Sequence, residues 1–193
     1  NSRMRAVIHM IGTVANPAVQ PKIYIAEQVT PLFAQLQHRY AGIEGSEYLG
    51  PKVPFGAKNE QGVRNEDLTA MSFGDDEFDT VLHFEVMEHV PDFEAAFAEC
   101  ARILKPGGQM LFSAPFGLNG EKNLIRARVR ADGSIEHILP PEYHGNPVSD
   151  EGSLAFQVFG WELLDQLEHW GFSSVQTLLY RSRAYCYLGG EQA

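Results

Sequence analysis

Short runs typical of β-strands alternate along this chain with longer amphipathic patterns typical of α-helices. The strand-like runs cover residues 22–26, 42–45, 62–66, 78–84 and 109–114. Parallel strands need crossover connections, and helices normally supply them. The alternation therefore predicts an α/β fold, in which a mostly parallel, Rossmann-like sheet is covered by helices on both faces.

The helical segments carry recognisable start and stop residues. Thr30 and Pro31 provide an N-cap and a first-turn proline for the helix after the first strand. A second helix is expected over residues 92–104, with its apolar side chains at helical spacing. Residues 106–108 (Pro-Gly-Gly) are expected to stop it.

The second half of the chain is less regular. Asp132-Gly133 separates two alternating runs, 124–130 and 134–139, which predicts a β-hairpin. A helix is then expected over residues 161–170. An antiparallel pair at residues 175–179 and 184–188 would close a sheet of seven strands.

A length of 193 residues suits a single domain. Within it we expect a helical lead-in over residues 1–20 and an inserted acceptor-side region over residues 115–159. Because the first residue is Asn1 and not Met, we expect residues before it to be missing.

Charge and cysteine content narrow the class of protein. The net charge of −10 disfavours nucleic acid as a partner, because binding to phosphates is driven by clustered Lys and Arg. No apolar run approaches the roughly 20 residues that span a bilayer, so we expect no membrane partner. Cys100 and Cys186 are too far apart for a CxxC motif, which favours a reducing, cytoplasmic location.

Candidate binding residues follow the predicted strands. Ligands of open α/β sheets bind at the carboxyl ends of the strands. Glu44 lies at the end of the second strand, where a carboxylate suits two ribose hydroxyls, although a surface glutamate in a turn fits the same position. Asp67 and the group His83, Phe84 and Glu85 follow later strands.

Three ordered motifs carry a resemblance to a known family. They read NEDLTAMSFGDDEFDTV at residues 65–81, FEVMEHV at 84–90 and RILKPGG at 102–108. In this order and spacing, the sequence resembles the type 11 branch of the class I methyltransferases that depend on S-adenosylmethionine (SAM).

The resemblance implies roles for individual residues in binding SAM. Glu44, with Gly45 beside it, would bind the ribose hydroxyls. Asp67 would accept a hydrogen bond from the adenine amino group, and the Leu68 amide would meet the neighbouring ring nitrogen. The cofactor's methionine end would be lined by His83, Phe84 and Glu85.

The glycine-rich loop of that family is absent after the first strand. Residues 27–31 (Glu-Gln-Val-Thr-Pro) stand in its place, so Glu27 and Gln28 occupy cofactor-facing positions. The helix that begins at Thr30 could still bind the cofactor carboxylate through its N-terminal amides. Glu27 could pair with the cofactor's ammonium group.

Histidines in the inserted region are the candidate catalytic bases. His144 is the first choice and His137 the second, although both could be ordinary solvent-facing or turn-stabilising groups. His89 would more commonly anchor the start of the following helix. A metal site from His137, Glu142 and His144 matches no known ligand spacing, so no metal is predicted.

Arg126, Arg128 and Arg130 alternate along one predicted hairpin strand. Alternation places the three side chains on one face, where they could steer an anionic acceptor. Basic residues also protect strand edges from aggregation, which is the more common role.

These features predict an enzyme that transfers a methyl group from SAM to a small-molecule acceptor. The altered loop at residues 27–30 leaves open a non-catalytic scaffold or a cofactor-sensing module. A nicotinamide-dependent dehydrogenase is disfavoured because no GxGxxG follows a strand. The sequence does not indicate an oligomeric state.

Overall fold

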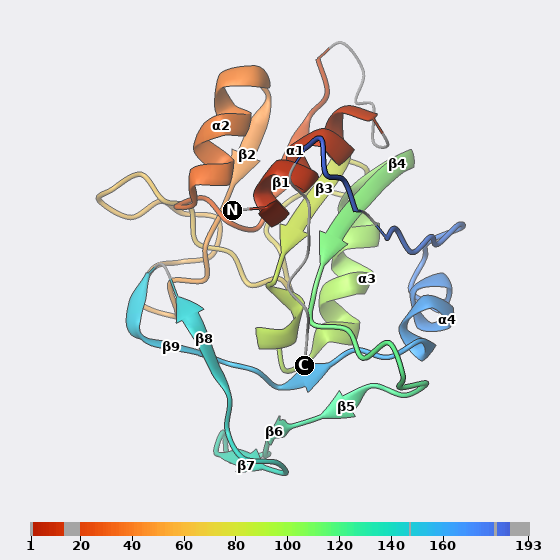
Figure 1. Ribbon diagram of the computed structural model, residues 1–193. Helices are drawn as coiled ribbons and strands as arrows, with labels where there is room; N and C mark the ends of the chain where they lie inside the picture. The colour runs from red at the N-terminus through yellow and green to blue at the C-terminus, as the bar shows by residue number, and fades with distance from the viewer. Residues whose placement is uncertain (1, 14–19, 147, 180, 186–193) are drawn as a thin grey trace.

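A four-stranded parallel sheet forms the centre of the molecule (Figure 1). The computed structural model describes residues 2–13, 20–146, 148–179 and 181–185. The strands are β1 (Ile23–Ile25), β2 (Ile43–Gly45), β3 (Phe78–Phe84) and β4 (Leu104–Ser113), in the order β2-β1-β3-β4. All three pairings are parallel, which confirms the α/β class.

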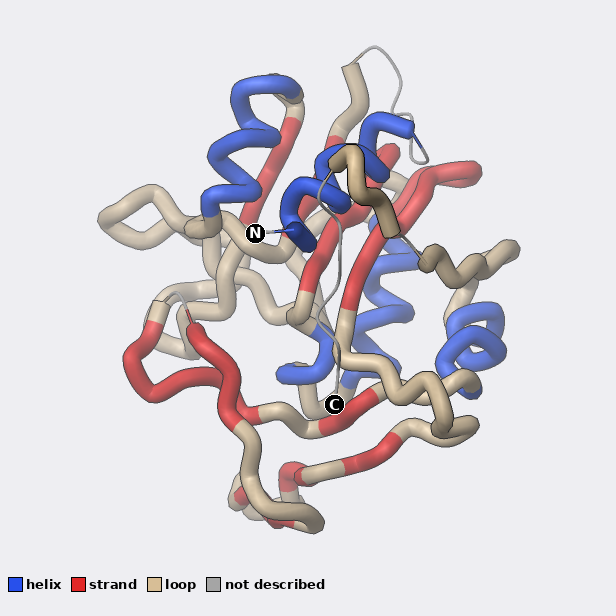
Figure 2. The backbone as a smooth tube through the Cα atoms, in the orientation of Figure 1, coloured by secondary structure: helices blue, strands red, loops and turns tan. Residues whose placement is uncertain are grey.

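Helices pack on both faces of this sheet (Figure 2). Helices α1 (Ser2–Thr13) and α2 (Pro31–Arg39) share one apolar cluster with the side chains of Ile23 and Ile25. Helices α3 (Phe93–Ile103) and α4 (Glu162–His169) share the other cluster with Tyr24. Successive residues of β1 therefore point to opposite faces, and both faces are buried, as in other parallel sheets.

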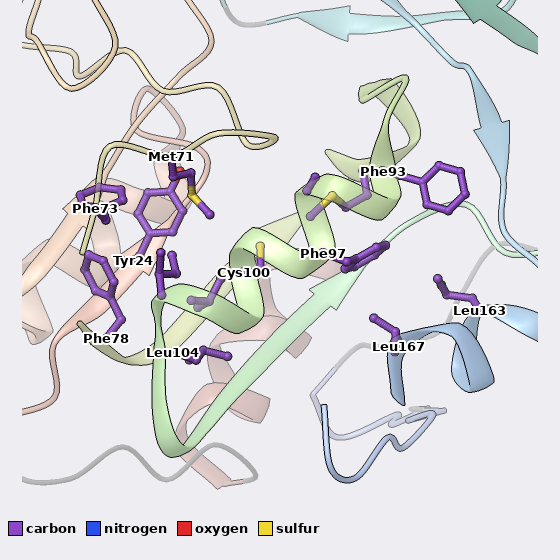
Figure 3. Packing of buried hydrophobic residues seen from close by; sticks show 14 of the residues in the cluster. Tyr24, Met71, Phe73, Phe78, Phe93, Phe97, Cys100, Leu104, Leu163 and Leu167 are labelled. Atoms are coloured by element: carbon purple, nitrogen blue, oxygen red, sulfur yellow. The ribbon is translucent and has the colours of Figure 1, made fainter. Parts of the chain in front are cut away.

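The cluster around α3 is rich in aromatic side chains. Phe97 stacks on Trp170 with 5.6 Å between ring centroids, and Phe93 meets Phe159 edge to face at 5.3 Å. Figure 3 shows Phe93, Phe97 and Cys100 of α3 among the side chains of this cluster. Burial of these apolar side chains holds α3 against the sheet, next to β3 and β4. The position of α3 in turn supports the two strands at whose ends the site is formed.

Helix α2 begins as the sequence predicts. The Thr30 hydroxyl accepts a hydrogen bond from the Phe33 amide at 3.3 Å, and Pro31 is the first helical residue. Leu32, Phe33 and Leu36 are buried. The first turn of α2 thus lies directly after β1, at the carboxyl end of the sheet.

Two local predictions are wrong. Residues 62–66 make only isolated bridges, Glu47 with Asn65 and Lys58 with Arg64, instead of a strand. The buried Asn65 side chain organises a loop there, because its amide donates to the carbonyls of Gly50 and Val53.

The second error concerns residues 106–108. Helix α3 ends at Ile103, and Leu104 is already extended and paired with Phe78. The next pair is Thr80 with Gln109, so the Pro-Gly-Gly segment is accommodated as an irregularity in β4. Gly107 there has a φ of 78°, which favours glycine.

Short antiparallel strands follow β4. They are β5 (Leu124–Ile125), β6 (Ala127–Val129), β7 (Ile135–His137), β8 (Tyr143–Asn146), β9 (Ser149–Leu154) and β10 (Gln157–Val158). β6 pairs with β7 around the predicted turn, β8 with β9, and β5 with β10. Figure 1 shows these strands gathered on the side where the central strands end.

The prediction of a seven-stranded sheet is wrong for the described residues. Residues 175–179 are irregular, although Val175 packs on the α3 cluster. The predicted partner segment at 184–188 begins in a turn, and its residues 186–188 lie outside the described part of the chain. Among the described residues, no helix combines the length and apolar character that crossing a bilayer requires.

Candidate functional site

A cavity of about 1270 Å³ lies at the carboxyl ends of the central strands. The segments after β1, β2 and β3 line one side of it, together with residues 66–69. The other side is lined by residues of β8 and β9 and by Val129 of β6. His89 of the short 3-10 helix η1 (Met87–His89), which follows β3, also lines the cavity.

Asp67 and Leu68, to which the resemblance gives roles in binding adenine, both line this cavity. Oδ1 of Asp67 accepts hydrogen bonds from the Thr69 amide at 2.9 Å and from the Thr69 hydroxyl at 2.7 Å. Because both bonds use the same oxygen, they hold the carboxylate in one orientation at the cavity wall.

Glu44 lies outside the cavity lining. Its carboxylate is near Lys22 at 3.5 Å and Arg64 at 3.9 Å, in half-exposed ion pairs. The reason is that β2 extends to Gly45, so Glu44 is a strand residue paired with Tyr24 and does not follow the strand.

The acidic residue that follows β2 in the cavity is Glu47, which sequence reasoning missed. Its Oε1 accepts a hydrogen bond from the Val29 amide at 2.9 Å. Burial raises the pKa of Glu47 above its usual value. Its position two residues beyond Gly45, the last residue of both the predicted run 42–45 and β2, is the signal that could have identified it.

The loop after β1 contributes Glu27 and Thr30 to the cavity, but not Gln28. The Gln28 side chain donates to the Gly62 carbonyl at 3.0 Å and accepts from the Arg64 amide at 2.8 Å, so it ties two loops together. Gly45 is likewise structural in this geometry. A Cβ on Gly45 would lie 2.7 Å from the Phe33 ring.

The residues at the end of β3 also divide between the cavity and the core. Phe84 and Glu85 line the cavity, whereas His83 is buried and stacks on Phe112 with 4.9 Å between centroids. Burial lowers the pKa of His83 to about 3, so the ring is neutral. Glu85 has a φ of 58°, unusual for a residue with a side chain, and its Oε1 accepts from the Ser113 hydroxyl.

His144 lines the cavity, and His137 does not. His137 is exposed on β7. The sequence grouped His137 with Glu142 and His144 as a conceivable metal site. Glu142 and His144 lie 3.3 Å apart, but His137 does not belong to the cluster of described residues that could hold a metal ion.

The structure places His144 beside two residues of η1. Nδ1 of His144 lies 3.5 Å from Oε1 of Glu88, and Nε2 of His89 lies 3.6 Å from the same oxygen. Burial raises the pKa of Glu88 to about 7, and the charge of Glu85 acts in the same direction. Burial also lowers the pKa of His89.

Sequence reasoning missed Glu88, although the motif FEVMEHV contains it. It also predicted that His89 anchors the start of the following helix. In the structure, Asp92 caps that helix, while Nδ1 of His89 bonds the carbonyl oxygen of Leu154 at 2.9 Å.

None of the three alternating arginines lines the cavity. Arg126 pairs with Glu142 at 3.0 Å, and Arg130 pairs with Glu136 at 3.1 Å. These ion pairs support a structural role at the hairpin.

Comparison with known proteins relates part of this chain to methyltransferases. Residues 26–112 match a family model described as a methyltransferase domain. A ubiquinone biosynthesis O-methyltransferase of Thiobacillus denitrificans is 49% identical over 83 residues, which is 42% of this chain and 33% of that protein. The sterol 24-C-methyltransferase erg6 of Aspergillus fumigatus is 32% identical over 104 residues, which is 51% of this chain and 26% of that protein. The chain spans about a third of the length of the first curated relatives it matches.

Solved structures share the fold at low sequence identity. An S-adenosylmethionine-dependent methyltransferase from Mesorhizobium loti aligns with a TM-score of 0.55 and 18% identity, over 90% of this chain and 82% of its own. A glycopeptide N-methyltransferase aligns with a TM-score of 0.58 and 13% identity, over 97% of this chain and 86% of its own. The alignments extend beyond the central sheet into the strands after β4.

Proposed function

We propose that this chain, whose residues 26–112 match a methyltransferase-domain family model, binds SAM and transfers its methyl group to a small molecule. The observation that carries the proposal is the cavity at the carboxyl ends of the strands, where α/β sheets bind nucleotide cofactors. The described residues that line it supply acidic groups and amides of the kinds that a nucleoside and an amino acid require.

The nucleoside is assigned to the wall formed by Glu47, Asp67 and Leu68. A carboxylate accepts hydrogen bonds with two oxygens, so Glu47 suits the two ribose hydroxyls. Asp67 suits the adenine amino group, and the amide of Leu68 suits the neighbouring ring nitrogen. Asp67 and Leu68 keep the roles that the resemblance implies, and Glu47 replaces Glu44.

The methionine end of SAM is assigned to the segments after β1 and β3. The first turn of α2 offers the Leu32 amide to a carboxylate, because Pro31 has no N–H and the Phe33 amide donates to the Thr30 hydroxyl. Glu27 suits the ammonium group, and Phe84 and Glu85 would lie near the sulfonium. No glycine is needed in the loop after β1 if the carboxylate is bound by this helix end.

The acceptor is assigned to the side of the cavity formed by β8, β9 and Val129. His144 is the candidate base there, because it alone of the two candidate bases from the sequence lines the cavity. A cavity of about 1270 Å³ leaves room for a small acceptor beside the cofactor. Since Arg126 and Arg130 are ion-paired and none of the three alternating arginines lines the cavity, an anionic acceptor remains a prediction.

Binding of SAM and S-adenosylhomocysteine by isothermal titration calorimetry tests the cofactor assignment. Asp67→Asn has a matched control in Asp132→Asn, because each aspartate accepts from the amide and hydroxyl of the residue two positions on. Only Asp67 lines the cavity. We expect Asp67→Asn to weaken binding about tenfold, the value of one charge-assisted hydrogen bond, and Asp132→Asn to leave it unchanged.

Turnover separates the enzyme from a non-catalytic module. The protein is incubated with methyl-labelled SAM and a small-molecule extract, and labelled products are resolved chromatographically. Labelled product requires an active enzyme. Tight cofactor binding without any product would support the scaffold or sensing role, and absence of binding at millimolar SAM would refute the proposal.

A further inference from the structure

We propose that Glu88, His89 and His144 bind one divalent transition-metal cation of the Zn²⁺ or Co²⁺ kind at the wall of the cavity. One nitrogen of each histidine and a carboxylate oxygen of Glu88 all lie within 4.8 Å of one another. Two of these residues belong to η1, and the third comes from β8, more than fifty positions along the chain.

The hydrogen bond made by His89 directs its free nitrogen toward Glu88. Nδ1 lies 2.9 Å from the carbonyl oxygen of Leu154, which can only accept, so Nδ1 carries the hydrogen. In a neutral imidazole the other nitrogen then has a lone pair. That nitrogen, Nε2, is the one 3.6 Å from the Glu88 carboxylate.

His144 has the same arrangement with the nitrogens exchanged. Its Nε2 lies 3.3 Å from Oε1 of Glu142, a carboxylate that accepts, so Nε2 carries the hydrogen. Nδ1 then has the lone pair and lies 3.5 Å from Oε1 of Glu88. Metal-bound histidines characteristically donate their second nitrogen to a carbonyl or a carboxylate in this way.

Glu88 is the residue that most requires a cation. Its side chain is 0% exposed, and neither carboxylate oxygen has a hydrogen-bond partner among the described residues. A buried carboxylate is costly unless it is paired, protonated or bound to a metal. With both imidazoles neutral, the two nearest nitrogens offer lone pairs, and a bound cation would supply the positive charge that Glu88 requires.

The spacing of the three groups suits a metal better than direct hydrogen bonds. The distances of 3.5 and 3.6 Å are longer than the 3.3 Å of the hydrogen bond between His144 and Glu142, and neither oxygen of Glu88 has a hydrogen-bond partner among the described residues. In a tetrahedral site with bonds of about 2.1 Å, neighbouring ligand atoms are about 3.4 Å apart. Two imidazoles and one carboxylate are a ligand set typical of Zn²⁺ and similar cations.

Three protein ligands leave at least one coordination position open. Since His89 and His144 line the cavity, that position would face the acceptor. A hydroxyl bound to the cation loses its proton more readily, so the favoured acceptor atom is an oxygen. This part rests on the proposed function: the oxygen bonds to the methyl carbon, the carbon–sulfur bond breaks with its electron pair going to sulfur, and the proton leaves to solvent.

Metal binding is tested on the whole chain without SAM. Protein dialysed against a chelator is titrated with Zn²⁺ by calorimetry and with Co²⁺ by visible absorption, which reports coordination geometry. We expect one cation per chain and the intense bands of a tetrahedral Co²⁺ site. Binding should also raise the melting temperature of the protein.

Variants identify the ligands. Glu88→Gln and His144→Asn should each weaken Zn²⁺ binding by more than about 100-fold, and Glu142→Gln, which only orients His144, by about tenfold. His137→Asn is the matched control, because His137 is exposed on β7 and lies outside the group. A melting curve of each variant in chelator detects any loss of folding, and Glu142→Gln keeps the test informative if a ligand variant unfolds.

Two results would overturn the proposal. One is the absence of saturable Zn²⁺ or Co²⁺ binding by the native chain, which would mean that protonated imidazoles neutralise Glu88. The other is binding that Glu88→Gln and His144→Asn leave unchanged. Because the titrations contain no SAM, a failure of metal binding is distinguished from a failure of cofactor binding.

Discussion

Oε1 of Glu47 accepts a hydrogen bond from the amide of Val29 at 2.9 Å, so the acidic residue after β2 holds the loop after β1. This bond joins the two segments to which we assign the ribose and the methionine end of SAM. It also explains how the loop is ordered without the glycines that usually occupy it.

The first prediction compares Glu47→Gln with Glu44→Gln. Glutamine keeps an oxygen that accepts from Val29 but removes the negative charge and one acceptor. We expect Glu47→Gln to raise the Kd for SAM about tenfold, measured by calorimetry, because a hydrogen bond to a charged group contributes about 1.5 kcal/mol or more. Glu44→Gln should change the Kd less than about twofold, since it removes only half-exposed ion pairs. A larger rise in the Kd from Glu44→Gln than from Glu47→Gln would indicate that Glu44 binds the ribose, as the sequence predicts.

The second prediction concerns Gly45→Ala. The added Cβ would lie 2.7 Å from the Phe33 ring and 3.0 Å from Cβ of Gln28, so β2 or α2 must shift. Overpacking of this kind costs about 1–3 kcal/mol, measured as the free energy of unfolding in urea. Gly145→Ala is the control, because its Cβ would meet nothing within 4 Å. Equal stability of the two variants would contradict the packing role of Gly45.

The third prediction is an acid-dependent loss of stability through Glu99. Arg102 donates to both carboxylate oxygens at 2.7 Å, and this lowers the pKa of Glu99 below its usual value. Since the folded-state pKa is lowered, the ionised group stabilises the fold above the unfolded-state pKa of about 4.3. That contribution is lost as the pH falls through the lowered folded-state value.

Urea unfolding of Glu99→Gln at a series of pH values between 7 and 3 tests this linkage. At pH 7 we expect a loss of about 1.5 kcal/mol or more, because Glu99 also accepts from the Met71 amide. The difference from the native chain should shrink as the pH falls below about 4. Glu94→Gln, an exposed position on the same helix, serves as the control. A difference that stays constant down to pH 3 would mean that the lost stability does not come from the charge.

The central sheet could be predicted because its determinants are local. Thr30 and Pro31 encode the start of α2 within three residues, and the buried run at 78–84 is a strand of the same bounds. The end of β2 at Gly45 also agrees with the predicted run 42–45. The pattern did not distinguish Glu44, which lies within the strand, from Glu47, which lies two residues beyond it and lines the cavity.

Side-chain direction and long-range contacts lie outside what the pattern encodes. In β3 nearly every residue is buried, so no alternation distinguishes His83, which packs in the core, from Phe84, which lines the cavity. The neighbourhood of Glu88 and His144 depends on how β8 and β9 fold over η1. No spacing in the sequence encodes that arrangement.

The fourth prediction tests the support of η1. The buried Gln157 side chain donates to the carbonyls of Met87 at 2.6 Å and Val90 at 3.0 Å, at the two ends of the segment that holds Glu88. Gln157→Met fills a similar volume but leaves both carbonyls without this donor. We expect a loss of about 1–3 kcal/mol in the free energy of unfolding. Gln109→Met, at an exposed position of β4, should change it by less than about 0.5 kcal/mol.

The last prediction separates the two histidines that the sequence indicated as bases. His144 lines the cavity and lies 3.5 Å from Glu88, whereas His137 is exposed on β7. Whether His144 takes a proton or holds a cation that activates the acceptor, its removal should affect the chemical step. With an acceptor found in the labelling assay, we expect His144→Asn to lower kcat by about 10²–10⁴-fold and to leave the Kd for SAM within about threefold. His137→Asn should leave both quantities unchanged. Equal turnover by the two variants would exclude His144 from the chemical step.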